Sequence, residues 1–119
     1  MANILILGAG SIGSAFSVPC LDRQHQVTIV GTHLEDKFID ELKNNINFHP
    51  TLKLHLSKET NIVKYSNLAH ELKKKPDLIV LAIISKGINW AADQLSNMSH
   101  DKNLPPILIL TKGLSIYKN

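Results

Sequence analysis

Three glycines near the start of the chain have the spacing of a phosphate-binding loop. The stretch GAGSIG, residues 8–13, stands between an apolar run expected to be a buried strand and a segment with helical periodicity. In such a unit Gly8 allows the tight turn, Gly10 leaves room for a pyrophosphate, and Gly13 lets the helix pack close to the strand. The free N–H groups at the start of the helix attract phosphate, and Ser11 adds a hydroxyl. The motif therefore predicts a dinucleotide-binding site.

The sequence does not decide which dinucleotide this loop would bind. An Asp or Glu about 20 residues past the motif binds the adenine ribose of NAD in many such proteins. Here the tip of the second predicted strand carries Gly31, Thr32 and His33, while Glu35 and Asp36 follow slightly later. No arginine stands at this tip to bind the 2′-phosphate of NADP. Thr32 and His33 can form hydrogen bonds with either cofactor, so the choice between NAD and NADP stays open.

Two further loops are expected at the same edge of the sheet, because ligands of open α/β sheets lie outside the carboxyl ends of the strands. The segment 82–87 includes Ile83 and Lys86 and follows the longest apolar run. It would border the nicotinamide half of a dinucleotide, with Lys86 itself solvated. Lys112 follows the last predicted strand. Its ammonium can either reach a phosphate, carboxylate or carbonyl oxygen of a substrate, or close the strand at the surface.

Other reactive residue types give no pattern of a second site. The six histidines have no paired metal-ligand spacing, and one cysteine cannot make a zinc site, so no metal is expected. Cys20 falls inside the first predicted helix without a nearby base, which favours a packed thiol over a nucleophile. The tract 73–75, three lysines before Pro76, is interpreted as the end of a helix. A nucleic-acid patch is the weaker interpretation, because few aromatic residues accompany the basic ones.

Strands and helices alternate along the chain. Apolar runs predict strands at 4–7, 27–30, 62–65, 78–84 and 107–110. Helical spacing predicts helices at 11–23, 35–45, 68–75 and 89–98. Pro19 is expected to kink the first helix unless that helix adapts to it, Trp90 is expected to pack a helix against the sheet, and the alternating leucines of 52–56 predict an exposed or edge strand. We therefore expect an α/β fold of the Rossmann type, doubly wound, with a mainly parallel sheet and helices on both faces.

The overall composition is that of one ordinary domain. The chain has 119 residues, of which 44% are hydrophobic and 19% charged, and its net charge of +3 is mild. No apolar run approaches the roughly 20 residues that a membrane span needs, and the first residues lack the basic region of a signal peptide. A single cysteine excludes an internal disulfide and is typical of a reducing compartment. A cytoplasmic location is the expectation.

Four segments together resemble a known family. GAGSIG at 8–13, VTIVG at 27–31, PDLIVLAI at 76–83 and LTKGL at 110–114 occur in the order and spacing of the N-terminal domain of NAD(P)-dependent glycerol-3-phosphate dehydrogenases. The resemblance covers essentially the whole chain, and the TKG element is its specific part. It implies that residues 1–119 form an NAD(P)-binding N-terminal domain. It also implies that the helical C-terminal domain, which supplies the catalytic lysine in the family, is absent from this chain, so no catalytic residue is expected here.

The resemblance implies roles for individual residues. The residues between the last two glycines of the loop and those after the second strand would contact the cofactor, and Lys112 would contact both cofactor and substrate. Together with the glycine loop and the loop after the fourth main strand, the expected cofactor-binding set is Gly8, Gly10, Ser11, Ile12, Gly13, Thr32, His33, Ile83 and Lys112. The family usually has an aromatic residue at the position of Ile12 and a proline at that of Ile84, and these departures concern the fine positioning of the cofactor.

The implied reaction is the reversible reduction of dihydroxyacetone phosphate by NAD(P)H to sn-glycerol 3-phosphate, a precursor of glycerophospholipids. The isolated chain is expected to bind the dinucleotide with negligible turnover, and apolar surface left by the missing domain would favour a homodimer. One alternative is a stand-alone NAD(P)-binding or sensing module without a reaction of its own. Another is a domain similar to ketopantoate reductases, although that family has Asn-Gly where this chain has Lys112 and Gly113.

Overall fold

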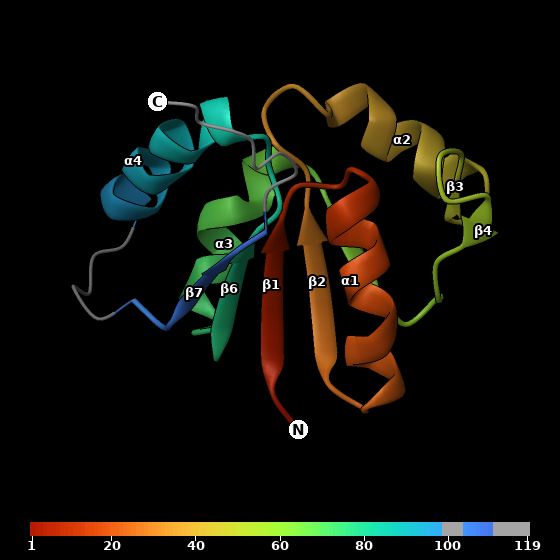
Figure 1. Ribbon diagram of the computed structural model, residues 1–119, viewed down its shortest axis with the longest axis horizontal. Coiled ribbons are helices and arrows are strands. Elements are labelled where there is room, and N and C mark those ends of the chain that lie inside the picture. The colour runs from red at the N-terminus through yellow and green to blue at the C-terminus, as the bar shows by residue number, and fades with distance from the viewer. Residues whose placement is uncertain (99–103, 111–119) are drawn as a thin grey trace, which may run out of the picture.

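A five-stranded parallel sheet forms the centre of the computed structural model, which describes residues 1–98 and 104–110 (Figure 1). Its strand order is β5-β2-β1-β6-β7, and every neighbouring pair is parallel. The strands are β1 (Asn3–Leu7), β2 (Gln26–Val30), β5 (Asn61–Val63), β6 (Leu78–Leu81) and β7 (Ile107–Ile109). The strand order reverses between β1 and β6, and this reversal is where open α/β sheets bind ligands.

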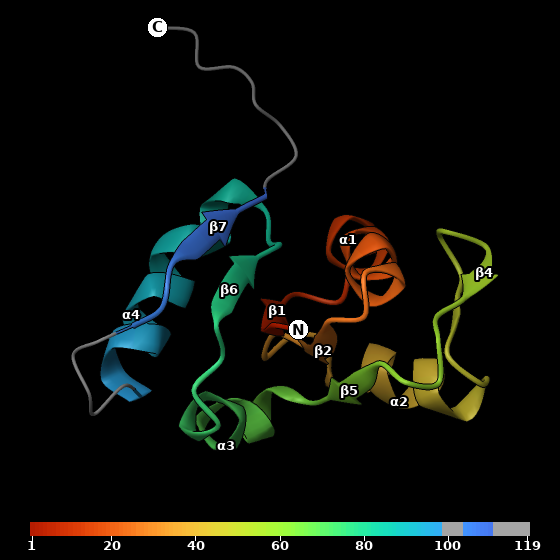
Figure 2. The same ribbon diagram turned by 90° about the horizontal axis from the view of Figure 1, so that it is seen from below.

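Four helices cover the two faces of the sheet. They are α1 (Ser11–Asp22), α2 (Asp36–Asn44), α3 (Leu68–Lys73) and α4 (Ile88–Met98), with the short 3-10 helices η1 (Tyr65–Asn67) and η2 (Ser85–Gly87) before α3 and α4. Figure 2 shows α1 and α2 on one side of the sheet and α3 and α4 on the other. The expected doubly wound α/β architecture is therefore confirmed.

The sheet separates two apolar cores, because successive side chains of a strand point to opposite faces. Ile4 and Ile6 of β1 belong to a cluster that includes Ile39 and Leu42 of α2. Leu5 and Leu7 belong to the other cluster, with residues of α3 and α4. All four of these β1 side chains are buried. This two-sided burial explains why the strands are continuous apolar runs in the sequence.

Two sequence expectations about strands need correction. The leucines of 52–56 were expected to form one exposed or edge strand, but β3 (Phe48–His49) and β4 (Leu54–His55) form a short antiparallel hairpin outside the main sheet. Positive φ angles at Ile46, Asn47 and Lys53 turn the chain there. The strand expected at 78–84 ends at Leu81, which pairs with Leu7, the last residue of β1, so the ladder has no partner beyond it.

Two helix expectations fit the structure. Helix α1 continues through Pro19 to Asp22. Helix α3 ends at Lys73, and Lys75 has a positive φ of 54° directly before Pro76. The lysine tract therefore marks the end of a helix, as interpreted from the sequence.

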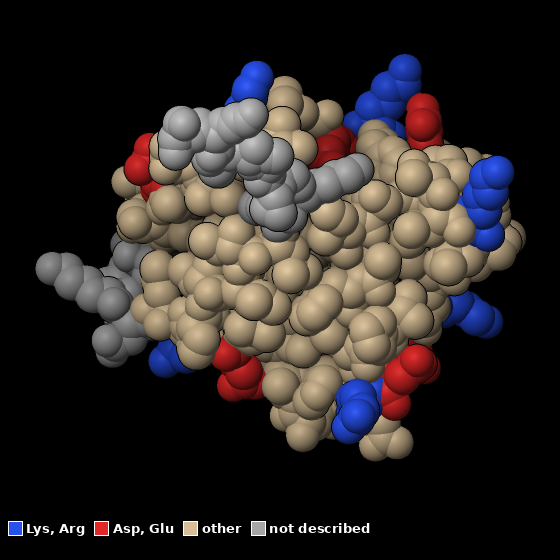
Figure 3. Space-filling model, in the orientation of Figure 1, with Lys and Arg blue, Asp and Glu red and all other residues tan. Residues whose placement is uncertain are grey.

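No helix in the described ranges has both the length and the apolar character to cross a membrane. On the face seen in Figure 3, basic and acidic side chains of both signs are interspersed around the periphery.

Cys20 lies in the core and gives the protein an expected sensitivity to alkali. Its side chain is buried, and burial raises the pKa of the thiol above its ordinary value. The unfolded chain therefore loses this proton at lower pH than the folded chain, so the free energy of unfolding should fall as pH rises through about 9, by less than about 1 kcal/mol at pH 9.5. Urea unfolding at about pH 7.5 and pH 9.5 measures this fall. Cys20→Ala should reduce it, and an unchanged fall in that variant would contradict the assignment.

Candidate functional site: the glycine loop and its groove

The glycine loop connects β1 to α1 and is held tightly by its neighbours. Gly8 has a φ of +119°, and its N–H donates to the carbonyl oxygen of Val30 at 2.8 Å. A Cβ at Gly8 would lie 2.2 Å from the carbonyl oxygen of Ala82, and one at Gly13 would lie 2.4 Å from that of Gly8. Both positions therefore require glycine, because β1, α1 and the segment after β6 meet there without room for a methyl group.

Gly10 differs from the other two glycines because it faces open space. A Cβ at this position would meet no described atom within 4 Å. Gly10 is the N-cap of α1, with extended backbone and no side-chain cap, and the first turn of this helix contains no acidic residue. No described residue accepts a hydrogen bond from the N–H groups of Ser11, Ile12 or Gly13. These free donors and the positive end of the helix dipole make the place suited to an anion.

Three side chains hold the peptide groups of Ala9 in the middle of the loop. Its N–H donates to Oε1 of Glu35 at 3.0 Å. Its carbonyl oxygen accepts from Oγ of Ser14 at 3.0 Å and lies 3.1 Å from Nε2 of His49. Nδ1 of His49 accepts from the N–H of Leu52 at 3.3 Å, which assigns the ring proton to Nε2. The loop is thus fixed before any ligand arrives.

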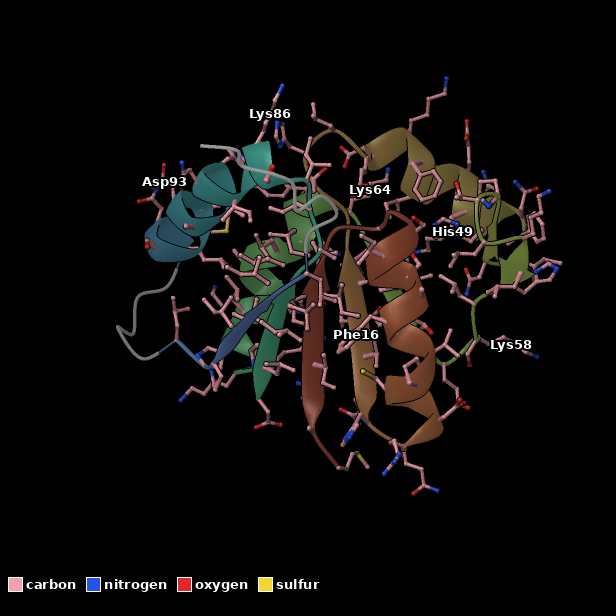
Figure 4. All side chains as sticks on the ribbon, viewed as in Figure 1. Phe16, His49, Lys58, Lys64, Lys86 and Asp93 are labelled. Carbon is pink, nitrogen blue, oxygen red and sulfur yellow. The ribbon has the colours of Figure 1, made fainter. Side chains whose placement is uncertain are left out.

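His49 reaches the loop from β3, forty positions along the chain from Ala9. Its side chain, labelled in Figure 4, is almost fully buried. The ring packs edge-to-face against Phe38 of α2. The hairpin therefore supports the glycine loop, a role that the sequence did not reveal. The only available signal was a histidine beside Pro50 in a segment of uncertain structure.

The chain after β2 turns back sharply toward the glycine loop. The N–H of Glu35 donates to the carbonyl oxygen of Thr32 at 3.0 Å, and the N–H of Thr32 donates to Oε1 of Glu35 at 2.8 Å. A Cβ at Gly31 would lie 2.8 Å from Cγ1 of Ile39, so glycine allows α2 to begin directly beside the end of β2. As a result the Glu35 carboxylate lies at the tip of β2, where the sequence seemed to place no acid.

A groove of about 580 Å³ extends from Gly10 past the β2 tip to α4. Its walls include Thr32, His33, Ile83 and Trp90. The His33 ring lies 4.3 Å from that of Trp90, centroid to centroid, and Trp90 also packs against the buried cluster on the α3–α4 face. A smaller hollow of about 190 Å³ adjoins it, lined by Gly10, Ser11, Ile12, Ala82, Ile83, Ile84 and Leu110. The two hollows share Gly10, Ala82, Ile83 and Ile84, so they meet between the start of α1 and the segment after β6.

Most of the residues predicted from the sequence lie around these two hollows. Gly10, Ser11, Ile12, Thr32, His33 and Ile83 line one or both, while Gly8 and Gly13 shape the loop. Lys86 borders the groove and is exposed, as expected. Lys112 lies outside the described residues. Within residues 1–98 and 104–110, no group of His, Cys, Asp or Glu side chains could hold a metal ion.

The parallel sheet, its strand order and the glycine loop at the point of reversal define a dinucleotide-binding domain of the Rossmann type. The family model for the N-terminus of NAD-dependent glycerol-3-phosphate dehydrogenase matches residues 3–119. The chain therefore belongs to this family, and it is the N-terminal NAD-binding domain of that family.

Curated relatives carry the same family name over nearly the whole chain. A glycerol-3-phosphate dehydrogenase [NAD(P)+] of Ehrlichia ruminantium (strain Welgevonden) is 30% identical over 115 residues, which are 96% of this chain and 34% of that protein. One of Streptococcus pneumoniae (strain ATCC 700669 / Spain 23F-1) is 33% identical over 116 residues, 94% of this chain and 31% of that protein. The chain thus spans about a third of the length of the curated relatives that it matches.

Solved structures confirm the fold. A glycerol-3-phosphate dehydrogenase from Coxiella burnetii superposes with a TM-score of 0.75 at 20% identity, covering 96% of this chain and 33% of that one. A 2-dehydropantoate 2-reductase from Methylococcus capsulatus gives 0.62 at 23% identity, covering 96% and 34%. Both likenesses concern the fold alone, so they do not separate the two enzyme classes. The family model and the curated relatives separate them in favour of the glycerol-3-phosphate dehydrogenases.

Proposed function

We propose that residues 1–119 bind NAD or NADP as the N-terminal domain of an enzyme that interconverts dihydroxyacetone phosphate and sn-glycerol 3-phosphate. The observation that carries the proposal is the prearranged glycine loop, where the described part of the chain leaves open space at Gly10 and offers no acceptor to the first N–H groups of α1. The relatives are glycerol-3-phosphate dehydrogenases [NAD(P)+], and from them the proposal takes its substrate and its cofactor. The substrate-binding helical domain would lie outside these residues.

Different residues around the two hollows would bind different parts of the cofactor. The backbone of Gly10 and the first turn of α1, with Ser11, would hold the pyrophosphate. Thr32 and His33 would contact the adenosine half, and Ile83 with Ile12 would cover the nicotinamide half. When bound, the nicotinamide supplies or accepts the hydride. The chain's own contribution is to orient the ring and to exclude water with apolar side chains.

Lys112 is proposed to contact both the cofactor and the substrate. Strand β7 is parallel to β6, so the carboxyl end of β7 lies at the same edge of the sheet as the glycine loop, and Lys112 follows β7 in the sequence. An ammonium there would stabilise negative charge on the phosphate or on the carbonyl oxygen that is reduced. The proton donor for that oxygen would come from outside residues 1–119.

The proposal also includes a cytoplasmic location and a homodimer. The single cysteine is consistent with a reducing compartment. Ile107, Leu108 and Ile109 of β7 are 41%, 38% and 50% exposed at the end of the sheet order, which offers an apolar edge to a second copy. Light scattering coupled to gel filtration would test the dimer.

Calorimetric titration of the chain with NADH and with NADPH tests the proposed function. Binding of at least one of them is expected, together with negligible oxidation of NADH in the presence of dihydroxyacetone phosphate. Absence of binding to both would overturn the proposal. Detectable turnover would overturn the division of labour between this domain and the rest of the enzyme.

A further inference from the structure

The Glu35 carboxylate occupies the place at the β2 tip where an acid that recognises ribose is expected. Its Oε1 accepts hydrogen bonds from the N–H groups of Ala9 and Thr32, at 3.0 and 2.8 Å. It therefore joins the glycine loop to the end of β2 although it stands four positions after Gly31. The turn from Thr32 to Glu35 reverses the chain and makes this possible.

The second oxygen of Glu35 is available to a ligand. No described residue donates a hydrogen bond to Oε2, and Oε2 is not a buried atom. Among the residues that the structure describes, no lysine, arginine or histidine forms an ion pair with Glu35. Glu35 lines the groove together with Gly10 and Thr32. The groove is thus lined by a carboxylate that has one oxygen without a hydrogen-bond donor or a cation among the described residues.

We infer that Glu35 recognises the adenine ribose by accepting a hydrogen bond from its 2′-hydroxyl, and that it makes the site selective for NAD(H) over NADP(H). The inference rests on the proposed function and goes beyond it, because that function leaves the cofactor open. A 2′-phosphate would bring close to two negative charges against a carboxylate that has no ion-pair partner among residues 1–98 and 104–110. The 2′-hydroxyl of NAD(H) would instead donate a hydrogen bond to Oε2, which has no donor among the described residues.

Lys86 also borders the groove, so its ammonium could in principle attract the 2′-phosphate of NADP(H). Figure 4 shows its side chain extending outward at the upper edge of the molecule. It forms no ion pair with Glu35, and it is exposed. A solvated lysine of this kind offers a 2′-phosphate only weak, screened attraction. The fixed carboxylate on two backbone N–H groups should therefore dominate the choice.

Paired titrations with NADH and NADPH on wild type and Glu35→Gln test the inference. Wild type should bind NADH tighter than NADPH by a factor on the order of 30. Glutamine keeps an oxygen for the N–H groups of Ala9 and Thr32 but removes the charge. The ratio of the two dissociation constants should therefore shrink about 10-fold, chiefly through tighter binding of NADPH.

Asp36→Asn is the matched control. It removes the same charge one position away, from an exposed residue that does not line the groove and has no hydrogen bond to the loop among the described residues. Its ratio should stay within about twofold of wild type, because an exposed charge is screened. Equal or tighter binding of NADPH by wild type, or an unchanged ratio in Glu35→Gln, would overturn the role of Glu35 while leaving the proposed function intact. Binding of neither dinucleotide by wild type would overturn both.

Discussion

Gly10→Val should remove measurable dinucleotide binding while leaving the fold intact. The added side chain would project into the open space above the start of α1, where the pyrophosphate must approach the backbone. No described atom lies within 4 Å of the new Cβ, so the branch point of the valine side chain has room within the described chain. The backbone at Gly10 is extended, with φ of −68° and ψ of −175°, which a β-branched residue adopts readily.

The measurement pairs calorimetric titration with urea unfolding of the same preparations. We expect affinity for both NADH and NADPH to fall at least about 100-fold, because the valine blocks the anion site of the helix N-terminus. The free energy of unfolding should fall by no more than about 1 kcal/mol, because valine is a poorer N-cap than glycine but the domain keeps its packing. Gly10→Ala, with a smaller side chain, should give an intermediate loss of affinity. Retained affinity in Gly10→Val would place the ligand elsewhere.

The elements that the sequence predicted well are those that local patterns determine. The three glycines of 8–13 and the apolar runs of β1 and β2 define a strand, a loop and a helix within a short stretch, so their arrangement follows from spacing alone. The strand beginning at Leu78 was predicted too long. Apolar character continues to Ile84, but the backbone ladder stops where β1 ends, and Ile84 is 66% exposed. Hydrophobicity alone cannot reveal where a partner strand stops.

The features that the sequence missed depend on how distant segments approach each other. Glu35 reads as an acid placed too late to mark the β2 tip, and only the turn begun by Thr32 brings its carboxylate back. His49 reads as one of six histidines, and only the β3–β4 hairpin carries it to Ala9. The available signal for Glu35 was its place at the N-cap of α2, four residues after Gly31 at the end of β2. For His49 the only signal was its place beside Pro50, which does not indicate a contact with Ala9.

Gly8→Ala and Gly13→Ala should each destabilise the domain strongly, in contrast to the substitutions at Gly10. At Gly8 the new methyl group would lie 2.2 Å from a backbone oxygen, and the φ of +119° is strained for any residue with a Cβ. At Gly13 it would lie 2.4 Å from the Gly8 carbonyl oxygen and 2.9 Å from the Ala82 Cβ. Backbone atoms cannot yield as a flexible side chain does, so we expect losses of about 2 to 4 kcal/mol in the free energy of unfolding.

Urea unfolding followed by the fluorescence of Trp90, the single tryptophan, measures both losses. Gly87→Ala is the matched control, because its Cβ would meet only side-chain atoms of Ile83, the nearest at 3.6 Å, in ordinary contact. That variant should change stability by less than about 0.5 kcal/mol, although Gly87 borders the same groove. If Gly8→Ala and Gly13→Ala were as stable as Gly87→Ala, the tight contact of β1, α1 and the segment after β6 would be wrong. If they are destabilised as expected, the loop has two glycines that permit the fold and one, Gly10, that permits the ligand.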